Sequence, residues 1–311
     1  MLRLPESGLK PYRDGHQTDL SIFCDWLEGS LLFTNHNALS LSDIKDVLME
    51  EHLYKSQDKA SEFLADVWHE FDRRRSALGQ SYPIKIENLR LLRVMPWRQS
   101  PAYSFCLLLS FAERYRNWAK GFGTDFTEQG SLFEEVTCAA LKQEMAGWTI
   151  TATGWSSSRA AGLKAIVEQV RALLGEDAGK LGKFPKFKVA KDAGLDVVLF
   201  RPFADTRIGF PLYLLQCASG VEWEGKRNQP NLNAWRTFID FAVMPKKALA
   251  IPFAVRDDEF WWSCRHMDGM LIDRMRLLSG GSRTPDWIAS DVKRRIISWM
   301  APRVKVLPLH K

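Results

Sequence analysis

Two short apolar stretches on either side of a polar turn constrain the fold of this chain more than any other feature. Residues 195–202 and 210–217 are rich in Leu, Val and Phe, and the turn between them ends on Gly209. Such stretches predict two β-strands joined as an antiparallel hairpin. The numbers of paired residues in a hairpin have a constant sum, and a turn centred on Thr206 makes that sum 412. This register places Asp196 opposite Gln216.

The predicted Asp196–Gln216 pair has the chemistry of a metal site. Directly opposed residues have Cβ atoms about 4.5–5.5 Å apart. A carboxylate and an amide oxygen at that separation can share one Mg²⁺, which takes oxygen ligands. A β-bulge would break this pairing. The alternative is that Asp196 caps or neutralises a neighbour at the start of its strand and that Gln216 satisfies a backbone group at a strand edge.

The remaining patterns predict two domains in the 311 residues. Residues 1–125 are expected to form a mainly helical N-terminal domain, with helices at 40–53, 60–78 and 101–120. Residues 126–311 are expected to form an α/β domain in which helices flank a mixed sheet. Besides the hairpin, its predicted elements are helices at 131–145, 158–175, 231–243 and 267–278 and strands at 148–153 and 247–255.

Composition and charge indicate the compartment and the class of partner that we expect. The chain lacks a run of about 18 apolar residues that would predict a membrane-spanning helix, the N-terminus lacks a signal-peptide core, and the five scattered cysteines fit reduced thiols. We therefore expect a soluble, cytoplasmic protein with no membrane partner. The formal net charge of +6 is compatible with a polyanionic partner.

Three smaller motifs have less specific interpretations. The basic run at 73–75 is expected to be a solvated helix face. Arg274 and Arg276 either contact a phosphate backbone or pair with acids of their own helix. Cys264 and His266 are two zinc-ligand types, but no second pair follows at suitable spacing, so we expect no zinc site there.

The order of several short segments resembles a known family. Phe133-Glu134-Glu135-Val136 is expected on a helix and is followed by Gly147-Trp148-Thr149-Ile150, by Gly194-Leu195-Asp196-Val197-Val198 and by Gln216-Cys217. This order, over residues 130–280, resembles the PD-(D/E)XK nuclease superfamily, and within it the Mrr-like restriction endonucleases.

The resemblance implies a restriction-endonuclease-like fold and a set of metal ligands. Glu134 corresponds to the acid of the first helix, with Glu135 as the alternative, and Asp196 to the central ligand. Gln216 stands where the family has Glu or Gln, and the backbone carbonyl of Cys217 supplies a further oxygen. The implied cofactor is Mg²⁺, with Mn²⁺ as the alternative ion.

The family's Gln-x-Lys motif is incomplete here, because Ala218 stands in the lysine position. That lysine helps to activate the attacking water and offsets charge on the phosphate. Lys226, in the glycine-containing loop that follows, is the expected replacement, and Lys142 on the predicted helix is the alternative. In the implied mechanism, metal held by the acids lowers the pKa of a bound water, and the lysine stabilises charge in the transition state.

Two functions therefore follow as expectations. The first is a Mg²⁺-dependent endonuclease that hydrolyses phosphodiester bonds of double-stranded DNA in bacterial restriction or anti-phage defence. The second is a catalytically inactive module of the same fold that binds nucleic acid or a partner protein of such a defence system. The sequence leaves open DNA or RNA as substrate, base specificity and oligomeric state.

Overall fold

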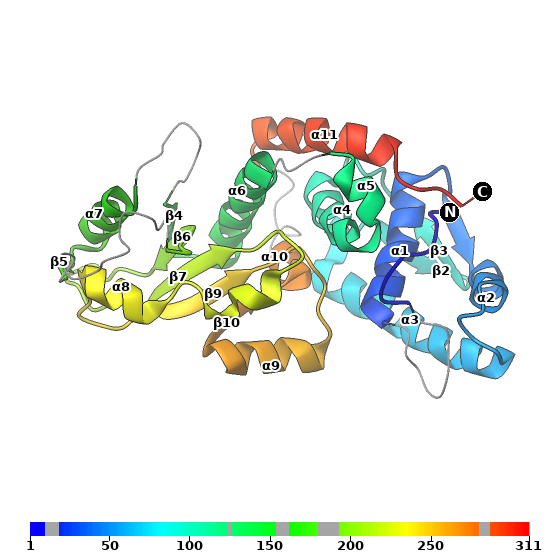
Figure 1. Cartoon of the computed structure of the whole chain (residues 1–311), viewed down its shortest axis with the longest axis horizontal. Helices are drawn as coiled ribbons and strands as arrows, with labels where there is room; N and C mark the ends of the chain where they lie inside the picture. The colour runs from blue at the N-terminus through cyan, green and yellow to red at the C-terminus, as the bar shows by residue number, and fades with distance from the viewer. Residues whose placement is uncertain (10–18, 123–125, 154–161, 180–192, 280–286, 311) are drawn as a thin grey trace. The chain divides into compact units, whose positions relative to one another are not determined.

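The chain divides into two compact units that interleave along the sequence. The structure, a computed structural model, describes residues 1–9, 19–122, 126–153, 162–179, 193–279 and 287–310. The first unit combines Met1–Thr124 with Arg274–Lys311, and the second is Asp125–Asp273 (Figure 1). The second domain was predicted to run to residue 311, and this extent is corrected: the C-terminal segment packs with the N-terminal residues instead.

The first unit is mainly helical. Its helices are α1 (Leu20–Phe33), α2 (Leu41–Glu50), α3 (Gln57–Leu78), α4 (Pro101–Arg114), α5 (Arg116–Lys120), α10 (Arg274–Ser279) and α11 (Ser290–Lys305), with a 3₁₀ turn η1 (Gly79–Ser81). The helices predicted at 40–53, 60–78 and 101–120 are confirmed as α2, α3 and the pair α4 and α5. Helix α2 begins with a capping box: the side chains of Ser40 and Asp43 each accept a hydrogen bond from the backbone N–H of the other residue.

A small sheet in this unit departs from the helical expectation. Strands β1 (Ala38–Ser40), β3 (Arg90–Arg93) and β2 (Ile84–Glu87) form an antiparallel sheet in that order. The chain ends also meet, since Leu2 and Leu309 form an isolated bridge and the N–H of His310 donates to Met1 O at 3.0 Å. The C-terminal segment is thus tied to the first residues of the chain.

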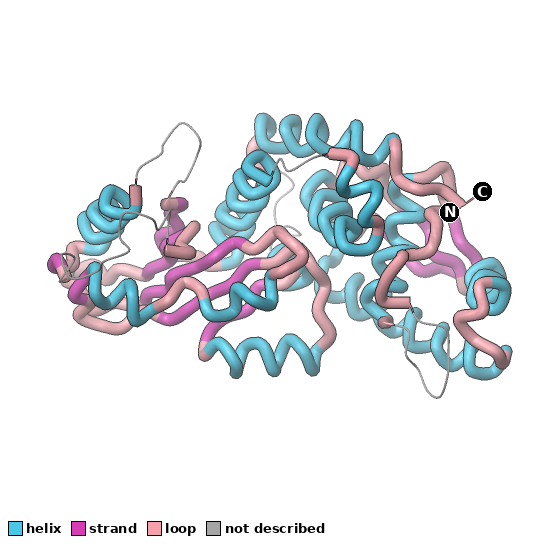
Figure 2. The backbone as a smooth tube through the Cα atoms, in the orientation of Figure 1, coloured by secondary structure: helices cyan, strands magenta, loops and turns pink. Residues whose placement is uncertain are grey.

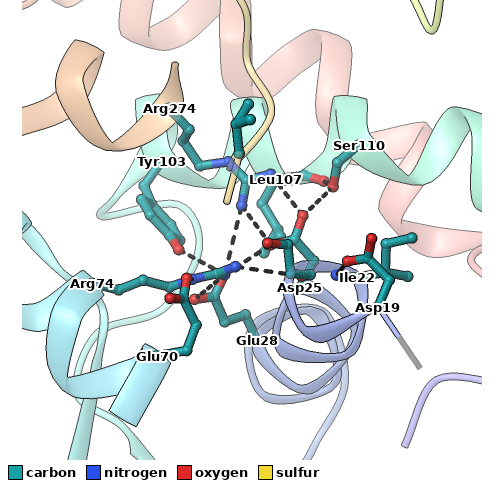
Figure 3. A network of polar contacts seen from close by, with 12 residues as sticks. Asp19, Ile22, Asp25, Glu28, Glu70, Arg74, Tyr103, Leu107, Ser110 and Arg274 are labelled. Atoms are coloured by element: carbon teal, nitrogen blue, oxygen red, sulfur yellow. Dashed lines mark hydrogen bonds and ion pairs between the residues drawn. The ribbon is translucent and has the colours of Figure 1, made fainter. Parts of the chain in front are cut away.

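Charged side chains fill part of the interior of the first unit (Figure 3). Arg74 and Arg274 are completely buried, and so is Glu28. Arg274 bonds both oxygens of Asp25, at 2.9 and 2.8 Å, and Arg74 bonds Asp25, Glu28 and Glu70, each at 2.8 Å. Burying a charge is costly unless it is paired, and here each guanidinium meets at least one carboxylate.

Neutral hydroxyl groups complete this charged network. Tyr82 and Tyr103 each donate to Glu28 at 2.6 Å, and Ser110 donates to Asp25 at 2.9 Å. The expectation that the run at 73–75 is a solvated face is therefore wrong for its central arginine, Arg74. Arg274 was expected to contact a phosphate backbone or an acid of its own helix. It pairs instead with Asp25 and Glu28 of α1.

The second unit is an α/β fold in which helices flank a five-stranded mixed sheet (Figure 2). The strand order is β10-β9-β7-β6-β4. Strands β9 and β10 run parallel to β7, whereas β6 is antiparallel to its neighbours. The strands are β4 (Thr149–Ala152), β6 (Val197–Phe200), β7 (Leu212–Cys217), β9 (Lys246–Ala250) and β10 (Gly269–Ile272), and the short pair β5 (Asp177–Ala178) and β8 (Ile239–Asp240) lies apart. The helices are α6 (Phe126–Glu144), α7 (Leu163–Leu174), α8 (Leu232–Phe238), α9 (Asp257–Met267) and the 3₁₀ helix η3 (Trp223–Asn228).

The predicted register of the hairpin is confirmed. Val197 pairs with Leu215 and Phe200 with Leu212, so the numbers of each pair add up to 412. The predicted helix at 267–278 is wrong, because the chain there forms the end of α9, strand β10 and α10. Residues of β10 pair in parallel with β9, and Gly269 allows the close approach: a Cβ on it would lie 2.5 Å from Lys247 O.

Two apolar clusters mark one face of this sheet. The first joins α7 and α8 to residues such as Leu195, Val198 and Leu214. The second joins η3 and α9 to residues such as Ala218 and Leu249. Helix α6 contacts β4 and β7, and its residues surround Cys217, the neighbour of Ala218 in β7. Because side chains alternate along a strand, α6 lies on the opposite face of the sheet.

Candidate functional site

The predicted site lies at the ends of two interior strands of the sheet, where β6 begins and β7 ends. Asp196 directly precedes β6, and its Oδ2 accepts a hydrogen bond from the N–H of Cys217 at 2.7 Å. Its backbone carbonyl accepts from the N–H of Thr153 at 2.8 Å. Asp196 therefore caps the backbone of β7 at the start of its own strand, which is the alternative that the sequence left open.

A β-bulge at Asp196 changes the face on which its side chain lies. The N–H of Asp196 donates to Leu215 O at 3.0 Å, although Leu215 is the partner of Val197. Two consecutive residues thus oppose one, as in a bulge. Leu195 packs in the cluster under α7 and α8 together with Val198, so the alternation of faces shifts by one between them. Asp196 is consequently directed toward α6.

Gln216 lies on the other face. Its side chain is buried, and the amide oxygen Oε1 has no hydrogen-bond partner in the described part of the chain. A Cβ on Gly194 would lie 3.0 Å from this oxygen and 2.7 Å from Oε1 of Gln229, and Gly194 has a φ of +71°. Only glycine fits this backbone conformation without strain. The register brings Asp196 and Gln216 to one strand end, but the bulge separates their side chains.

On the α6 side, two carboxylates surround two thiols. Burial raises the pKa of Cys138 to about 12, and the negative charges of Glu134 and Asp196 act in the same direction against the opposing charge of Lys142. Burial raises the pKa of Cys217 well above its usual range, and the charges of Asp196 and Glu134 add to the effect. The structure thus brings Glu134 and Asp196 within electrostatic reach of the same pair of sulfurs.

Glu134 fits this position better than Glu135. The charge of Glu134 is among the causes that raise the pKa of both thiols, whereas the charge of Glu135 has the smallest effect of those acting on Cys138. Glu135 also accepts a hydrogen bond from Ser131 at 3.2 Å on its own helix. The first of the two predicted acids is therefore the one that α6 directs toward the end of β7.

The two lysines expected to replace the motif lysine are placed differently. Lys226 is exposed on η3, whose buried residues are Trp223 and Arg227. Lys142 lies one helical turn beyond Cys138 on the face of α6 that also carries Glu134, and its charge acts on the Cys138 thiol. Of the two, Lys142 is the one whose charge lowers the pKa of a thiol at the site.

The β7 residues on the α6 side differ from those that the motif names. Ala218, in the lysine position, is buried in the cluster under η3 and α9. Because side chains alternate along the strand, those of Cys217 and Ser219 lie on the face of the sheet that α6 covers. Ser219 accepts hydrogen bonds from Nε2 of Gln129 on α6, at 3.1 Å to Oγ and 3.2 Å to its carbonyl oxygen.

The residues present do not fit the predicted Mg²⁺ site. Glu134 and Asp196 lie on one side of the sheet, while the amide oxygen of Gln216 lies on the other. Within the described ranges, no three His, Cys, Asp or Glu side chains form a group that could hold a metal ion. The added neighbours are neutral thiols, and Mg²⁺ prefers oxygen ligands.

A stack of aromatic and cationic groups beside η3 was not predicted. The guanidinium of Arg227 lies 4.5 Å from the ring centroid of Trp223 and 4.9 Å from that of Trp262. The ring of His266 stacks on Trp262 at 4.7 Å. The stack joins η3 to α9, and neither Trp223 nor Trp262 stands beside a basic residue in the sequence, so neighbours in the chain do not predict it.

No protein-family model, curated protein or solved structure matches the chain. None of the described helices is long and apolar enough to cross a membrane.

Proposed function

We propose that residues 125–273 form a catalytically inactive module of the restriction-endonuclease-like class that binds nucleic acid. One observation carries this proposal: the side of the sheet that holds Glu134 and Asp196 receives Cys217 and Ser219 from β7. The Mrr-like pattern has Gln and Lys on this strand. On this side of the sheet, the proposed module keeps the two acids and lacks both the side-chain oxygen ligand and the cation that the family pattern has on β7.

The chemistry of hydrolysis explains why this replacement matters. Metal-assisted phosphodiester cleavage needs oxygen ligands that hold the ion and a charge that stabilises the transition state. The Cys217 thiol has a raised pKa and is therefore neutral at physiological pH, and a neutral thiol is a poor ligand for a hard cation. A serine hydroxyl at position 219 cannot replace a lysine charge.

The architecture supports the choice of class. Helix α6, strand β4 and the β6–β7 hairpin contain, wholly or in part, the four segments on which the resemblance rests, and they follow one another in the same order along the chain, with α7 and β5 between β4 and β6. From that resemblance we also propose a restriction-endonuclease-like fold for this unit, a setting in anti-phage defence and a partner protein of that system.

An active Mg²⁺-dependent endonuclease is the second candidate, and Lys142 is the observation that favours it. This lysine, Glu134 and Asp196 all act electrostatically on Cys138. An acid pair with a cation supplied by α6 instead of β7 would retain the two acids and the cation of the family pattern and lack its Gln ligand.

Plasmid cleavage and DNA binding together separate the two candidates. Purified full-length protein is incubated with supercoiled plasmid in Mg²⁺, Mn²⁺ or EDTA, beside the Asp196→Ala and Lys142→Ala variants, with Lys164→Ala on the exposed face of α7 as a matched control. The proposal expects no metal-dependent cleavage, and binding of labelled DNA or RNA by anisotropy. Cleavage that both site variants abolish and the control retains would establish the endonuclease instead. Protein that neither cleaves nor binds nucleic acid would exclude both candidates and leave a partner protein as the ligand.

A further inference from the structure

The positive charge of the chain is concentrated in one segment. Residues 1–124 contain 16 Lys and Arg and 16 Asp and Glu, and residues 125–273 contain 18 and 19. Residues 274–311 contain 9 basic residues and only 2 acidic ones. The net charge of +6 therefore comes from the C-terminal segment of the first unit, and the predicted nuclease-like unit is nearly neutral.

Helix α11 displays part of this charge on a fixed scaffold. Its apolar residues Val292, Ile296 and Met300 are buried, and the helix packs on α4. Arg294 and Lys305 are exposed. They are three helical turns apart, so they share one face and lie about 16 Å from each other along the axis.

Aromatic side chains hold the C-terminal half of α11 in place. The guanidinium of Arg303 lies 3.7 Å from the ring centroid of Trp299 and 4.8 Å from that of Phe122. Nε1 of Trp118 on α5 donates to Arg303 O at 2.9 Å. Helix α5 is therefore adjacent to α11 within the first unit (Figure 1).

Helix α5 adds two more exposed cations, Arg116 and Lys120. These two cations lie on the side of α5 turned away from Trp118 and α11, because two residues correspond to more than half a helical turn. We therefore leave them out and refer to the exposed α11 residues Arg294 and Lys305 as the α5–α11 surface. Their charges are carried by a helix that is already anchored to the unit, so little further ordering is needed when a ligand binds.

We propose that the α5–α11 surface binds the phosphate backbone of double-stranded DNA. Duplex DNA carries one negative charge per about 1.7 Å of axis, and lysine and arginine side chains bind it by displacing its counterions. The aromatic rings near the surface, Trp118 and Trp299, are engaged in packing, so they do not offer the base-stacking platform that single strands use. The apolar stripe of α11 is buried, which removes the face that a membrane-surface helix inserts into lipid.

This inference concerns the first unit and does not depend on the metal site or on binding by residues 125–273. The experiment measures binding of the full chain to a short fluorescent DNA duplex by anisotropy at several salt concentrations. The test variant is Arg294→Gln with Lys305→Gln. The matched control is Lys55→Gln with Arg75→Gln, which removes the same charge from exposed residues of the same unit.

The salt dependence gives the expected size of the effect. Each phosphate contact contributes about 0.9 to the slope of log K against log salt. Loss of two contacts makes the slope shallower by about 1.8. If test variant and wild type bind equally at 1 M salt, this difference corresponds to about 60-fold weaker binding of the variant at 0.1 M salt. The control keeps the wild-type slope. Unchanged far-ultraviolet circular dichroism and thermal midpoint show that both variants fold.

Four results would overturn the proposal. These are an equal loss in test and control variants, no loss in either, tighter binding to a single strand than to the duplex, and binding to phosphatidylserine vesicles but not to DNA. Asp196→Ala separates this inference from the proposed function. If that change abolishes DNA binding while Arg294→Gln with Lys305→Gln does not, the second unit carries the binding and the α5–α11 surface does not.

Discussion

Replacement of Arg274 by Met tests whether the buried charge network holds the first unit together. Arg274 is completely buried and bonds Asp25 through both terminal nitrogens, and Glu28 lies 3.7 Å away. Methionine keeps most of the length of the side chain but removes the charge, which leaves Asp25 with Arg74 as its remaining cation. Breaking a buried ion pair in this way costs about 3–5 kcal/mol. In a domain of this size, 1 kcal/mol shifts the thermal midpoint by about 2–4 °C, so we expect a fall of about 6–20 °C.

The same substitution changes the response to acid. Burial by itself raises the pKa of Asp25, but the charges of Arg274 and Arg74 outweigh it and bring the pKa to about 2, from an ordinary value of 3.8. Because the folded pKa is the lower one, this carboxylate stabilises the fold above about pH 4, and the contribution is lost as the pH falls toward 2. It amounts to about 2 kcal/mol at 1.36 kcal/mol per unit. Without Arg274 the folded pKa rises, and the contribution shrinks.

Thermal unfolding of the full chain, followed by circular dichroism between pH 3 and pH 7, measures both effects. Arg276→Met is the matched control, because Arg276 is exposed on the same short helix. The double variant Asp25→Asn with Arg274→Met should lose less stability than the two single variants combined, because it leaves no unpaired charge at that point. A midpoint for Arg274→Met within about 2 °C of the control would refute the reasoning.

Three further predictions concern other parts of the chain. The Cys138 and Cys217 thiols should resist iodoacetamide at pH 8, since a pKa of about 12 leaves Cys138 with a thiolate fraction of about 10⁻⁴. Rapid alkylation of either thiol in peptide mass maps of the folded protein would contradict the raised pKa values. Gly194→Ala should destabilise the second unit by about 1–3 kcal/mol, because its φ is positive and two amide oxygens crowd its Cβ position, whereas Gly225→Ala, with open space around it, should be nearly neutral in urea unfolding. Ser40→Ala should cost about 1 kcal/mol through loss of the α2 cap, and an unchanged urea midpoint would show that the cap is not formed in solution.

The sequence predicted the hairpin because its determinants are local. The length of the turn and the positions of the apolar residues set the register, and the pairs formed by residues 197–200 have the predicted sum of 412. The bulge at Asp196 was not predictable in the same way. It depends on the packing of Leu195 under α7 and α8 and on a bond from Asp196 to Leu215, and both involve other elements. A shift of one residue was enough to divide the predicted ligands between two faces.

The buried arginines show a second limit of sequence patterns. Arg74 belongs to a run that is typical of a solvated face, and Arg274 lies near two other charged residues. Their partner Asp25 is 49 residues away from the first and 249 from the second. No local pattern marks Arg74 as the buried arginine of its run, because only Glu70 lies on the same helix and its other carboxylates, Asp25 and Glu28, come from α1. The helix predicted at 267–278 failed for a related reason: pairing with β9 makes residues 269–272 a strand.

The interleaving of the two units has a consequence for how the chain folds as it is synthesised. Asp25, Glu28 and Arg74 are synthesised well before Arg274, which follows Asp25 by 249 residues. At about 5–20 residues per second, the wait is about 12–50 s. All of the second unit is translated within that interval. Until Arg274 is made, the nascent first unit has its buried carboxylates with only one of its two buried arginines, so this network is completed only after the second unit has been translated.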